Sequence, residues 1–225
     1  GRRRDDRERE RESRIGRRQR RVESRGEGTA PSLVEMSAPR VRIATPEDHP
    51  AILAIYNHYV VNDHATFDIT PFILTEREPW FATFDGHRHT LLIAEDDSGC
   101  LGYAAATPFR PRPGYATTVE TTVYSAPHAI GRGIGRLLLE VLLEHCDATG
   151  VHTEIAAIAL PNPASERLHT GLGYQPIGVM PEVGRKFDRW IDIRWYQRLA
   201  GGAPSGDVGD AQGEPAASSG KDARR

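Results

Sequence analysis

The stretch of sequence best suited to chemistry joins one carboxylate to a glycine-rich loop. Glu120 lies in the β-branched run Thr117–Tyr124, and the chain then passes through Gly131-Arg132-Gly133-Ile134-Gly135-Arg136 into a leucine-rich segment. Glycines let a backbone approach a ligand closely, and the free N–H groups at a helix start point toward an anion. Arg132 and Arg136 add positive charge. The order of strand, loop and helix predicts a phosphate-binding site, with a glycine-rich surface turn as the alternative.

Residue spacing excludes several other kinds of site. The loop lacks the Lys-Ser/Thr ending of a nucleoside-triphosphate loop, and Leu138 takes the place of the third glycine of a dinucleotide fingerprint. His87-Arg88-His89 is the only tight histidine pair and has no Cys or Glu at ligand spacing, so we expect no metal. No Gly-x-Ser-x-Gly turn is present, and neither Cys100 nor Cys146 has a helix-start environment that would activate a thiolate.

The elements that must position these residues alternate between strands and helices. Val41–Ala44 is predicted as a strand, and Thr45 and Pro46 are typical of the start of a helix. The remaining predicted elements are a helix over Thr75–Phe84, a hairpin of Leu91–Ala94 with Leu101–Thr107, a central strand Thr117–Tyr124, a helix Gly135–Cys146, a strand Thr153–Ala159, a helix Asn162–Thr170, and two final strands, Tyr174–Met180 and Trp190–Leu199. This alternation predicts a mixed α/β sheet in a single domain.

Composition sets the ends of that domain apart. The 225 residues are enough for one domain with tails, and no apolar stretch reaches the roughly 20 residues of a membrane span. Residues 1–35 form an Arg-rich leader that we expect to be disordered, with Met36 as the hypothetical native start, and residues 201–225 form a Gly/Ala/Ser tail. The domain, residues 36–200, is acidic, because residues 31–199 hold 14 Lys and Arg against 20 Asp and Glu.

Charge and cysteine content also bear on partners and compartment. An Arg-rich leader is typical of nucleic-acid tails, but the interspersed Asp and Glu cancel much of its field, so we do not expect a nucleic-acid partner. Two cysteines allow one disulfide at most, which a domain of this size does not need. With no charged-then-apolar leader, we expect reduced thiols and a cytoplasmic protein without a membrane partner.

The motifs, taken in order, resemble the GNAT superfamily of acetyl-CoA-dependent N-acetyltransferases. The resemblance extends from about Val41 to Leu199. Within the superfamily, the motifs are most similar to those of the phosphinothricin and methionine sulfoximine acetyltransferases. The matching segments are Tyr56-Asn57-His58-Tyr59, Thr118-Val119-Glu120, the Gly-x-Gly-x-Gly loop, Leu160-Pro161-Asn162, Ser165, Arg167-Leu168-His169, Gly173-Tyr174, and Trp190-x-Asp192 through Gln197.

The resemblance implies a GNAT fold and a binding site for acetyl-CoA. The implied sheet is mixed, mostly antiparallel, with six to seven strands splayed at the cofactor site and about four flanking helices. The strand ending at Tyr124 would separate from the strand starting near Thr153, and the pantetheine arm would lie in the gap. The implied binding residues are Val123, Tyr124 and Ser125 through their backbone, Gly131, Arg132, Gly133, Ile134, Gly135 and Arg136 for the pyrophosphate, and Asn162. Ile130 departs from the superfamily, which usually has Gln or Arg there.

Acetyl transfer to an amine requires a base, because most amines are protonated at pH 7. The subfamily has a glutamate at the position of Glu120, which the resemblance makes the general base, directly or through one water. A core-edge Glu paired with an Arg is the structural alternative. His169 stands where many relatives carry a Tyr that protonates the CoA thiolate, and it either does that work or packs under the cofactor sulfur.

For the acidic end of the substrate we favour Arg110, because a planar guanidinium suits a carboxylate or phosphinate. Lys186 is the second candidate, a solvated loop charge is the alternative for Arg110, and Phe67 and Tyr115 are expected to form walls of the pocket.

The sequence therefore predicts an enzyme that moves acetyl from acetyl-CoA to the α-amine of a small amino-acid-like compound, such as phosphinothricin or methionine sulfoximine or sulfone. The alternatives are a GNAT enzyme for another amine, such as a peptide N-terminus or a polyamine, and a non-catalytic acyl-CoA-binding module. A homodimer is expected from the resemblance alone.

Overall fold

The computed structural model describes residues 37–201. The predicted leader, and the predicted tail apart from Gly201, lie outside these residues. Seven strands form one sheet in the order β1-β2-β3-β4-β5-β7-β6. They are β1 (Arg40–Ile43), β2 (Thr90–Asp96), β3 (Gly99–Pro108), β4 (Thr118–Ser125), β5 (Thr153–Ala159), β6 (Gln175–Lys186) and β7 (Arg189–Leu199). Every neighbouring pair is antiparallel except β4 with β5, which confirms the mixed, mostly antiparallel sheet.

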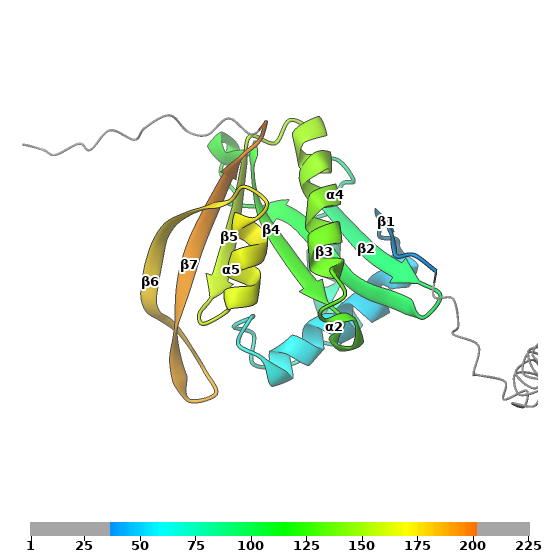
Figure 1. Cartoon of the computed structure of the whole chain (residues 1–225), viewed down its shortest axis with the longest axis horizontal. Helices are drawn as coiled ribbons and strands as arrows, with labels where there is room; N and C mark the ends of the chain where they lie inside the picture. The colour runs from blue at the N-terminus through cyan, green and yellow to red at the C-terminus, as the bar shows by residue number, and fades with distance from the viewer. Residues whose placement is uncertain (1–36, 202–225) are drawn as a thin grey trace, which may run out of the picture. The chain divides into compact units, whose positions relative to one another are not determined.

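Four α-helices cover the sheet: α2 (His49–Asn62), α3 (Leu74–Phe81), α4 (Ile134–Ala148) and α5 (Pro163–Thr170). Figure 1 shows α4 and α5 in front of the sheet and α2 behind it. The structure differs from the prediction at the first helix, because Thr45 precedes a 3₁₀ turn, Pro46–Asp48, before α2 begins. The Thr45 N–H donates to Asp48 Oδ2 over 2.7 Å, so this turn satisfies its own polar groups.

The core lies on both faces of the sheet, under α4 on one side and under α2 on the other. Leu138, Leu139 and Leu142 are fully buried, as their helical spacing predicted. Leu138 packs close to β3 because that strand presents Gly102, where an added Cβ would come within 3.2 Å of the Leu138 side chain. No helix within residues 37–201 is both long and apolar enough to span a membrane.

The last hairpin is longer than the sequence indicated. β6 continues through Pro181 to Lys186, where the prediction ended the strand at Met180. Its pairing with β7 shifts register between Met180 and Gly184, and Glu182 has a positive φ of 50°. A bulge of this kind carries the strand past residues that would otherwise end it, which hydrophobic alternation does not reveal.

The feature of the fold that matters most for function is a fork between β4 and β5. These strands pair only through Thr118–Thr153, Val119–Glu154 and Glu120–Ile155. Beyond that point β4 stays paired with β3 as far as Ser125, and β5 stays paired with β7 as far as Ala159. The facing backbone edges of β4 and β5 are therefore left unpaired with each other over the second half of both strands.

Candidate active site

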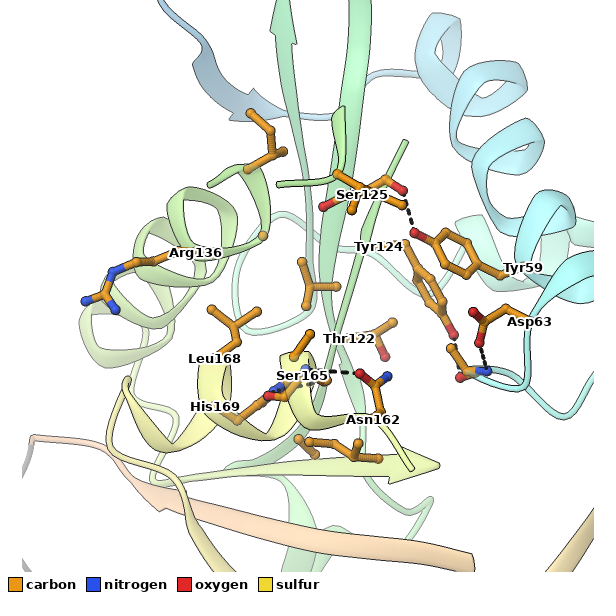
Figure 2. Close-up of a pocket in the computed structure, with 18 of the residues that line it drawn as sticks. Tyr59, Asp63, Thr122, Tyr124, Ser125, Arg136, Asn162, Ser165, Leu168 and His169 are labelled. Atoms are coloured by element: carbon orange, nitrogen blue, oxygen red, sulfur yellow. Dashed lines mark hydrogen bonds between the residues drawn. The ribbon is translucent and has the colours of Figure 1, made fainter. Parts of the chain in front are cut away.

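A pocket of about 570 Å³ opens at this fork. Its walls come from the diverging halves of β4 and β5, the start of α4, α5, and the chain at the end of α2 (Figure 2). The pocket thus reaches from the α4–α5 face of the sheet toward the α2 face. Nearly all of the residues expected to bind acetyl-CoA line it, namely Val123, Tyr124, Ser125, Gly131, Gly133, Ile134, Gly135, Arg136 and Asn162.

The glycine loop gives the α4 end of the pocket its shape. Gly131 and Gly133 have φ of 82° and 79°, values that side chains disfavour, and an added Cβ at either would meet no atom within 4 Å. Gly133 is the N-cap of α4, so the free N–H groups of the first turn open next to the pocket. Gly135 is restricted by packing, since an added Cβ would lie 3.3 Å from the Leu168 side chain. A backbone cradle of this kind fits a phosphate group.

Arg132 is the exception among the predicted pyrophosphate residues. Its side chain does not line the pocket. The guanidinium binds Asp96 Oδ2 over 2.7 Å, because the β2–β3 turn lies beside the loop, and the Arg132 N–H donates to the Ala129 carbonyl oxygen over 3.2 Å. Arg132 therefore fastens the loop to β2. Ile130, where the superfamily has a polar residue, lines the pocket and is exposed.

Strand alternation decides which backbone groups of β4 face the gap. The Thr153 N–H donates to the Thr117 carbonyl oxygen, so the polar groups of Thr117 point toward β5. Because the direction alternates along a strand, those of Val123 and Ser125 point the same way, whereas those of Tyr124 point toward β3. Tyr124 thus faces the pocket with its side chain, which differs from the backbone contact expected of it.

Thr121 holds the vertex of the fork. Its buried hydroxyl donates to the Ile155 carbonyl oxygen over 3.3 Å and lies 2.7 Å from the Tyr174 hydroxyl. Since Ile155 is the last β5 residue paired with β4, this side chain satisfies a polar group at the point where the strands part. Sequence reasoning did not identify this role, because a threonine in a β-branched run has no distinctive signal.

Asn162 closes the pocket from the side of α5. Its side-chain oxygen accepts a hydrogen bond from the Ser165 N–H over 3.1 Å and thereby caps the helix. The amide NH₂ of Asn162 is the part left to donate to a ligand.

His169 lies on α5 and lines the same pocket. Its Nδ1 lies 2.8 Å from the Ser165 carbonyl oxygen, which can only accept, so Nδ1 carries the proton. Burial lowers the pKa of His169, so the ring is neutral near pH 7, with Nε2 as an acceptor. The ring packs edge-on against Tyr174 with centroids 5.1 Å apart. This geometry makes His169 a proton acceptor first, and a donor only after it has been protonated.

Glu120 lies on the opposite face of the sheet from Val119, Thr121 and Val123. By alternation it shares the α2 face with Thr122 and Tyr124, which line the pocket, although Glu120 itself does not. Burial raises the pKa of its carboxyl, and the nearby Arg110 charge opposes that rise. Within residues 37–201 no salt bridge reaches Glu120, so the structural ion pair considered from the sequence does not form there.

The predicted substrate residues lie outside the pocket lining. Arg110 is exposed in the loop after β3, where it stacks over Phe109 at 4.4 Å. Tyr115 contacts the same ring, with centroids 5.6 Å apart. Phe67 packs instead against β6, because an added Cβ on Gly184 would come within 2.7 Å of its ring.

Lys186 does not fit the alternative role of a substrate anchor. It is buried, and its Nζ donates to the carbonyl oxygens of Tyr59 and Thr66 over 3.2 and 2.8 Å. It ties the β6–β7 hairpin to the end of α2. Burial lowers the pKa of Lys186.

The α2 side of the pocket contains residues that the sequence did not single out for a role in the site. The Tyr59 hydroxyl donates to the Ser125 carbonyl oxygen over 2.7 Å, and the Tyr124 hydroxyl donates to the Ala65 carbonyl oxygen over 3.1 Å. Asp63 lies beside them (Figure 2). In the sequence, only the motif Tyr56-Asn57-His58-Tyr59 pointed to this region. It indicated the family without assigning a function to any of these residues. No group of three metal-ligating side chains occurs in the described part of the chain.

Comparison with known proteins gives consistent results. The sequence profile of the acetyltransferase (GNAT) family matches residues 52–174. A phosphinothricin N-acetyltransferase from Streptomyces coelicolor is 45% identical over 162 residues, which cover 71% of this chain and 95% of that protein. An L-methionine sulfoximine/L-methionine sulfone acetyltransferase from Pseudomonas aeruginosa is 42% identical over 158 residues, which cover 70% of this chain and 92% of that protein.

A solved structure shows the same fold. The phosphinothricin acetyltransferase from Sinorhizobium meliloti, determined in complex with acetyl-CoA, superposes with a TM-score of 0.71 at 35% identity. The superposition covers 78% of this chain and 95% of that structure.

Proposed function

The chain belongs to the GNAT acetyltransferase family, and from that premise we propose that it transfers the acetyl group of acetyl-CoA to the α-amine of a small amino-acid-like substrate. Phosphinothricin and methionine sulfoximine or sulfone are the first candidates, because relatives 42–45% identical over most of their length carry those names. The two ends of the pocket support this reaction in different ways.

The observation that carries the proposal is the fork joined to a glycine loop. A phosphate at the start of α4 would meet free N–H groups, and an extended arm could pair with the open edges of Val123 and Ser125. Asn162 would donate to the same arm. An acyl-CoA has this shape, a diphosphate followed by an extended chain with two amides, and its thioester supplies an activated acetyl group.

Glu120 is proposed as the general base. Burial raises the pKa of its carboxyl toward the working range of a base, and the α2 face on which it lies also holds Thr122 at the pocket wall. Successive residues on one face of a strand are about 7 Å apart, so a single water can relay the proton from the pocket to Glu120. The amine is thereby neutral when it meets the thioester carbon, and an N–H of β4 that faces the gap is placed to stabilise the oxyanion.

His169 is proposed to act on the opposite face, close to the departing sulfur. Because its Nε2 is unprotonated near pH 7, His169 can take the proton that the attacking nitrogen loses from the tetrahedral intermediate and donate it to the departing thiolate. Arg110, Phe67 and Tyr115 are retained as candidates for substrate recognition, although none of them lines the pocket, and of the three only the Arg110 charge acts on Glu120.

We also propose that the protein forms a homodimer through the edge strand β6. Ile177, Val179, Met180 and Val183 are exposed along this strand, and Trp190 is exposed on β7. An unpaired edge with exposed apolar side chains is a typical site for pairing with a second chain. Light scattering is expected to give twice the chain mass, and an Ile177→Asp Val179→Asp variant is expected to give the single mass. A single mass for the wild type contradicts this proposal.

An amine panel tests the proposed function. We expect thiol release from acetyl-CoA with phosphinothricin, methionine sulfoximine and methionine sulfone, and slower release with a peptide N-terminus or spermidine. Fastest turnover with the peptide or spermidine would move the chain to another substrate class of the family. Binding of acetyl-CoA without release to any amine would indicate a non-catalytic acyl-CoA-binding module.

A further inference from the structure

The charged side chains of the pocket are separated by location. Within residues 37–201, Asp63 and Arg136 are the two charged side chains that line it, since His169 is neutral near pH 7. Arg136 lies on the first turn of α4, beside the proposed phosphate site. Asp63 lies at the end of α2, on the far side of β4 (Figure 2). The Arg136 guanidinium is paired with Glu140 over 2.8 Å, so the charge that the lining offers to a ligand is mainly the negative one of Asp63, where an acceptor would enter.

The carboxylate of Asp63 is held in place by the backbone. Its Oδ1 accepts a hydrogen bond from the Ala65 N–H over 2.8 Å, and the Tyr124 hydroxyl binds the Ala65 carbonyl oxygen. Asp63 is also the C-cap of α2, at the negative end of that helix's dipole. With 44% of its side chain exposed, the carboxylate keeps lone pairs available to a ligand. The position of Asp63 in the pocket lining and the dipole of α2 both favour the binding of a cation at this carboxylate.

Within residues 37–201 no lysine or arginine forms a salt bridge with this carboxylate, although its negative charge favours the ammonium form of the nearby Lys186. Lys186, the nearest lysine packed against α2, directs its ammonium to the carbonyl oxygens of Tyr59 and Thr66. His64 Nδ1 lies 3.6 Å from Asp63 Oδ1, and its Nε2 lies 3.1 Å from the Pro161 carbonyl oxygen. A carbonyl can only accept, so Nε2 of His64 carries a proton and directs it away from Asp63.

We propose that Asp63 binds the ammonium group of the acceptor and so selects amines that enter as cations. This inference rests on the proposed function and deepens it by dividing two tasks between two carboxylates. Asp63 attracts and orients the protonated amine, and Glu120 on the same face of the sheet takes the proton before transfer. Asp63 is a specificity residue in this scheme, because it contacts the substrate without exchanging a proton.

The test compares two acceptors that share the sulfone and carboxylate groups and differ in the charge of the reacting nitrogen. One is methionine sulfone, and the other is its aminooxy analogue, whose nitrogen is uncharged near pH 7. For Asp63→Asn we expect KM for methionine sulfone to rise about tenfold, with kcat changed by less than about threefold. We expect no rise in KM for the aminooxy analogue and no change in Kd for acetyl-CoA. Asp188→Asn is the control, because that side chain is 97% exposed on the distal turn of the β6–β7 hairpin.

The outcomes separate the two proposals. An equal rise in KM for both acceptors, or weaker acetyl-CoA binding in Asp63→Asn, overturns the assignment of Asp63 and leaves the proposed function intact. An unchanged KM of Asp63→Asn for methionine sulfone likewise overturns the assignment of Asp63 and leaves the proposed function intact. Absence of turnover by the wild type with both acceptors contradicts the proposed substrate class, and it removes the amino-acid ammonium as the partner of Asp63.

Discussion

The two faces of the sheet carry one glutamate each beside the fork, half-buried Glu120 on β4 and buried Glu154 on β5. Glu120 pairs in register with Ile155, and Glu154 pairs with Val119, one position away. Burial raises the pKa of both carboxyls, that of Glu154 to about 7. Their surroundings differ. Glu154, on the α4 face, is fully buried and bound by Arg198 over 2.8 Å, whereas Glu120, on the α2 face, has no salt bridge within residues 37–201.

The difference teaches that a raised pKa does not by itself identify a base. Arg198 also binds Asp147 over 2.9 Å, so Glu154 helps join α4, β5 and β7 below the vertex of the fork. Both faces continue into the pocket, through Thr122 beyond Glu120 and through Ala156 beyond Glu154, but only Glu154 is held by an arginine within residues 37–201. We therefore propose proton transfer for Glu120 and a structural role for Glu154, and substitutions can separate the two roles.

The largest expected effect is on turnover at Glu120. Glu120→Gln removes the proton acceptor and keeps the shape of the side chain, so kcat is expected to fall about a hundredfold or more, the scale of general base catalysis. Thiol release at saturating substrates measures this. The wild-type rate is expected to rise with pH as Glu120 ionises, and the variant is expected to lose that rise. Glu154→Gln serves as the control. An equal loss of turnover in this variant would contradict the proposal that Glu120 alone of the two glutamates transfers the proton.

The second prediction concerns stability at Glu154. Its folded pKa of about 7 lies above the ordinary value of 4.5, so the folded protein retains a proton that the unfolded chain releases between these values. The free energy of unfolding therefore falls as pH rises from about 4.5 to about 7 and then levels off. Glu154→Gln is expected to lack this contribution, which is on the order of 3 kcal/mol.

Urea unfolding at about pH 5 and about pH 8 measures that difference. Groups shared by the wild type and Glu154→Gln cancel when the two pH profiles are subtracted. Parallel profiles would contradict the burial of an ionisable Glu154.

A smaller effect is expected in the glycine loop. Gly133→Val places a β-branched residue at a φ of 79° and fills space beside the proposed phosphate site. The left-handed conformation alone costs about 1–2 kcal/mol, so Kd for acetyl-CoA is expected to rise about tenfold or more. Gly86→Val is the matched control, since Gly86 has a φ of 72° and open space around it, away from the pocket. Calorimetry measures the Kd values. Equal values for both variants would contradict the proposal that the loop binds acetyl-CoA.

The smallest expected effect distinguishes the two arginines of the loop. Arg136 lines the pocket and pairs with Glu140 on its own helix, whereas Arg132 lies outside the lining and is held by Asp96. Arg136→Gln is therefore expected to weaken acetyl-CoA binding by a few-fold, and Arg132→Gln by less. Because the interaction with a phosphate is electrostatic, the gap between them is expected to shrink in high salt. A larger loss for Arg132→Gln would mean that Arg132 leaves Asp96 when the donor binds.

The donor side of the site was more accessible to sequence reasoning than the acceptor side. Glycines at Gly131 and Gly133 and the capping Asn162 act through local geometry, which leaves a local pattern in the sequence. The leucines of α4 and the strands around the fork followed from periodicity in the same way. Arg132 could not be placed correctly, because its partner Asp96 is distant in sequence.

The acceptor side is built from segments that only the fold brings together. Asp63 and Tyr59 come from the end of α2, Glu120 from β4, and Lys186 from the end of β6. Neither the approach of Lys186 to the Tyr59 carbonyl nor the packing of Phe67 on Gly184 has a signal in spacing or composition. Side chains that meet through long-range contacts stay hidden until the topology is known.

The central claim is that the donor and the acceptor enter from opposite faces of the sheet and meet at the fork. A crystal structure with CoA and methionine sulfone tests it most directly. We predict the pantetheine arm between β4 and β5, with the amine nitrogen on the α2 face within about 3.2 Å of Glu120 or of one water bound to it. An amine bound on the α4–α5 face, or separated from Glu120 by more than one water, would contradict the account.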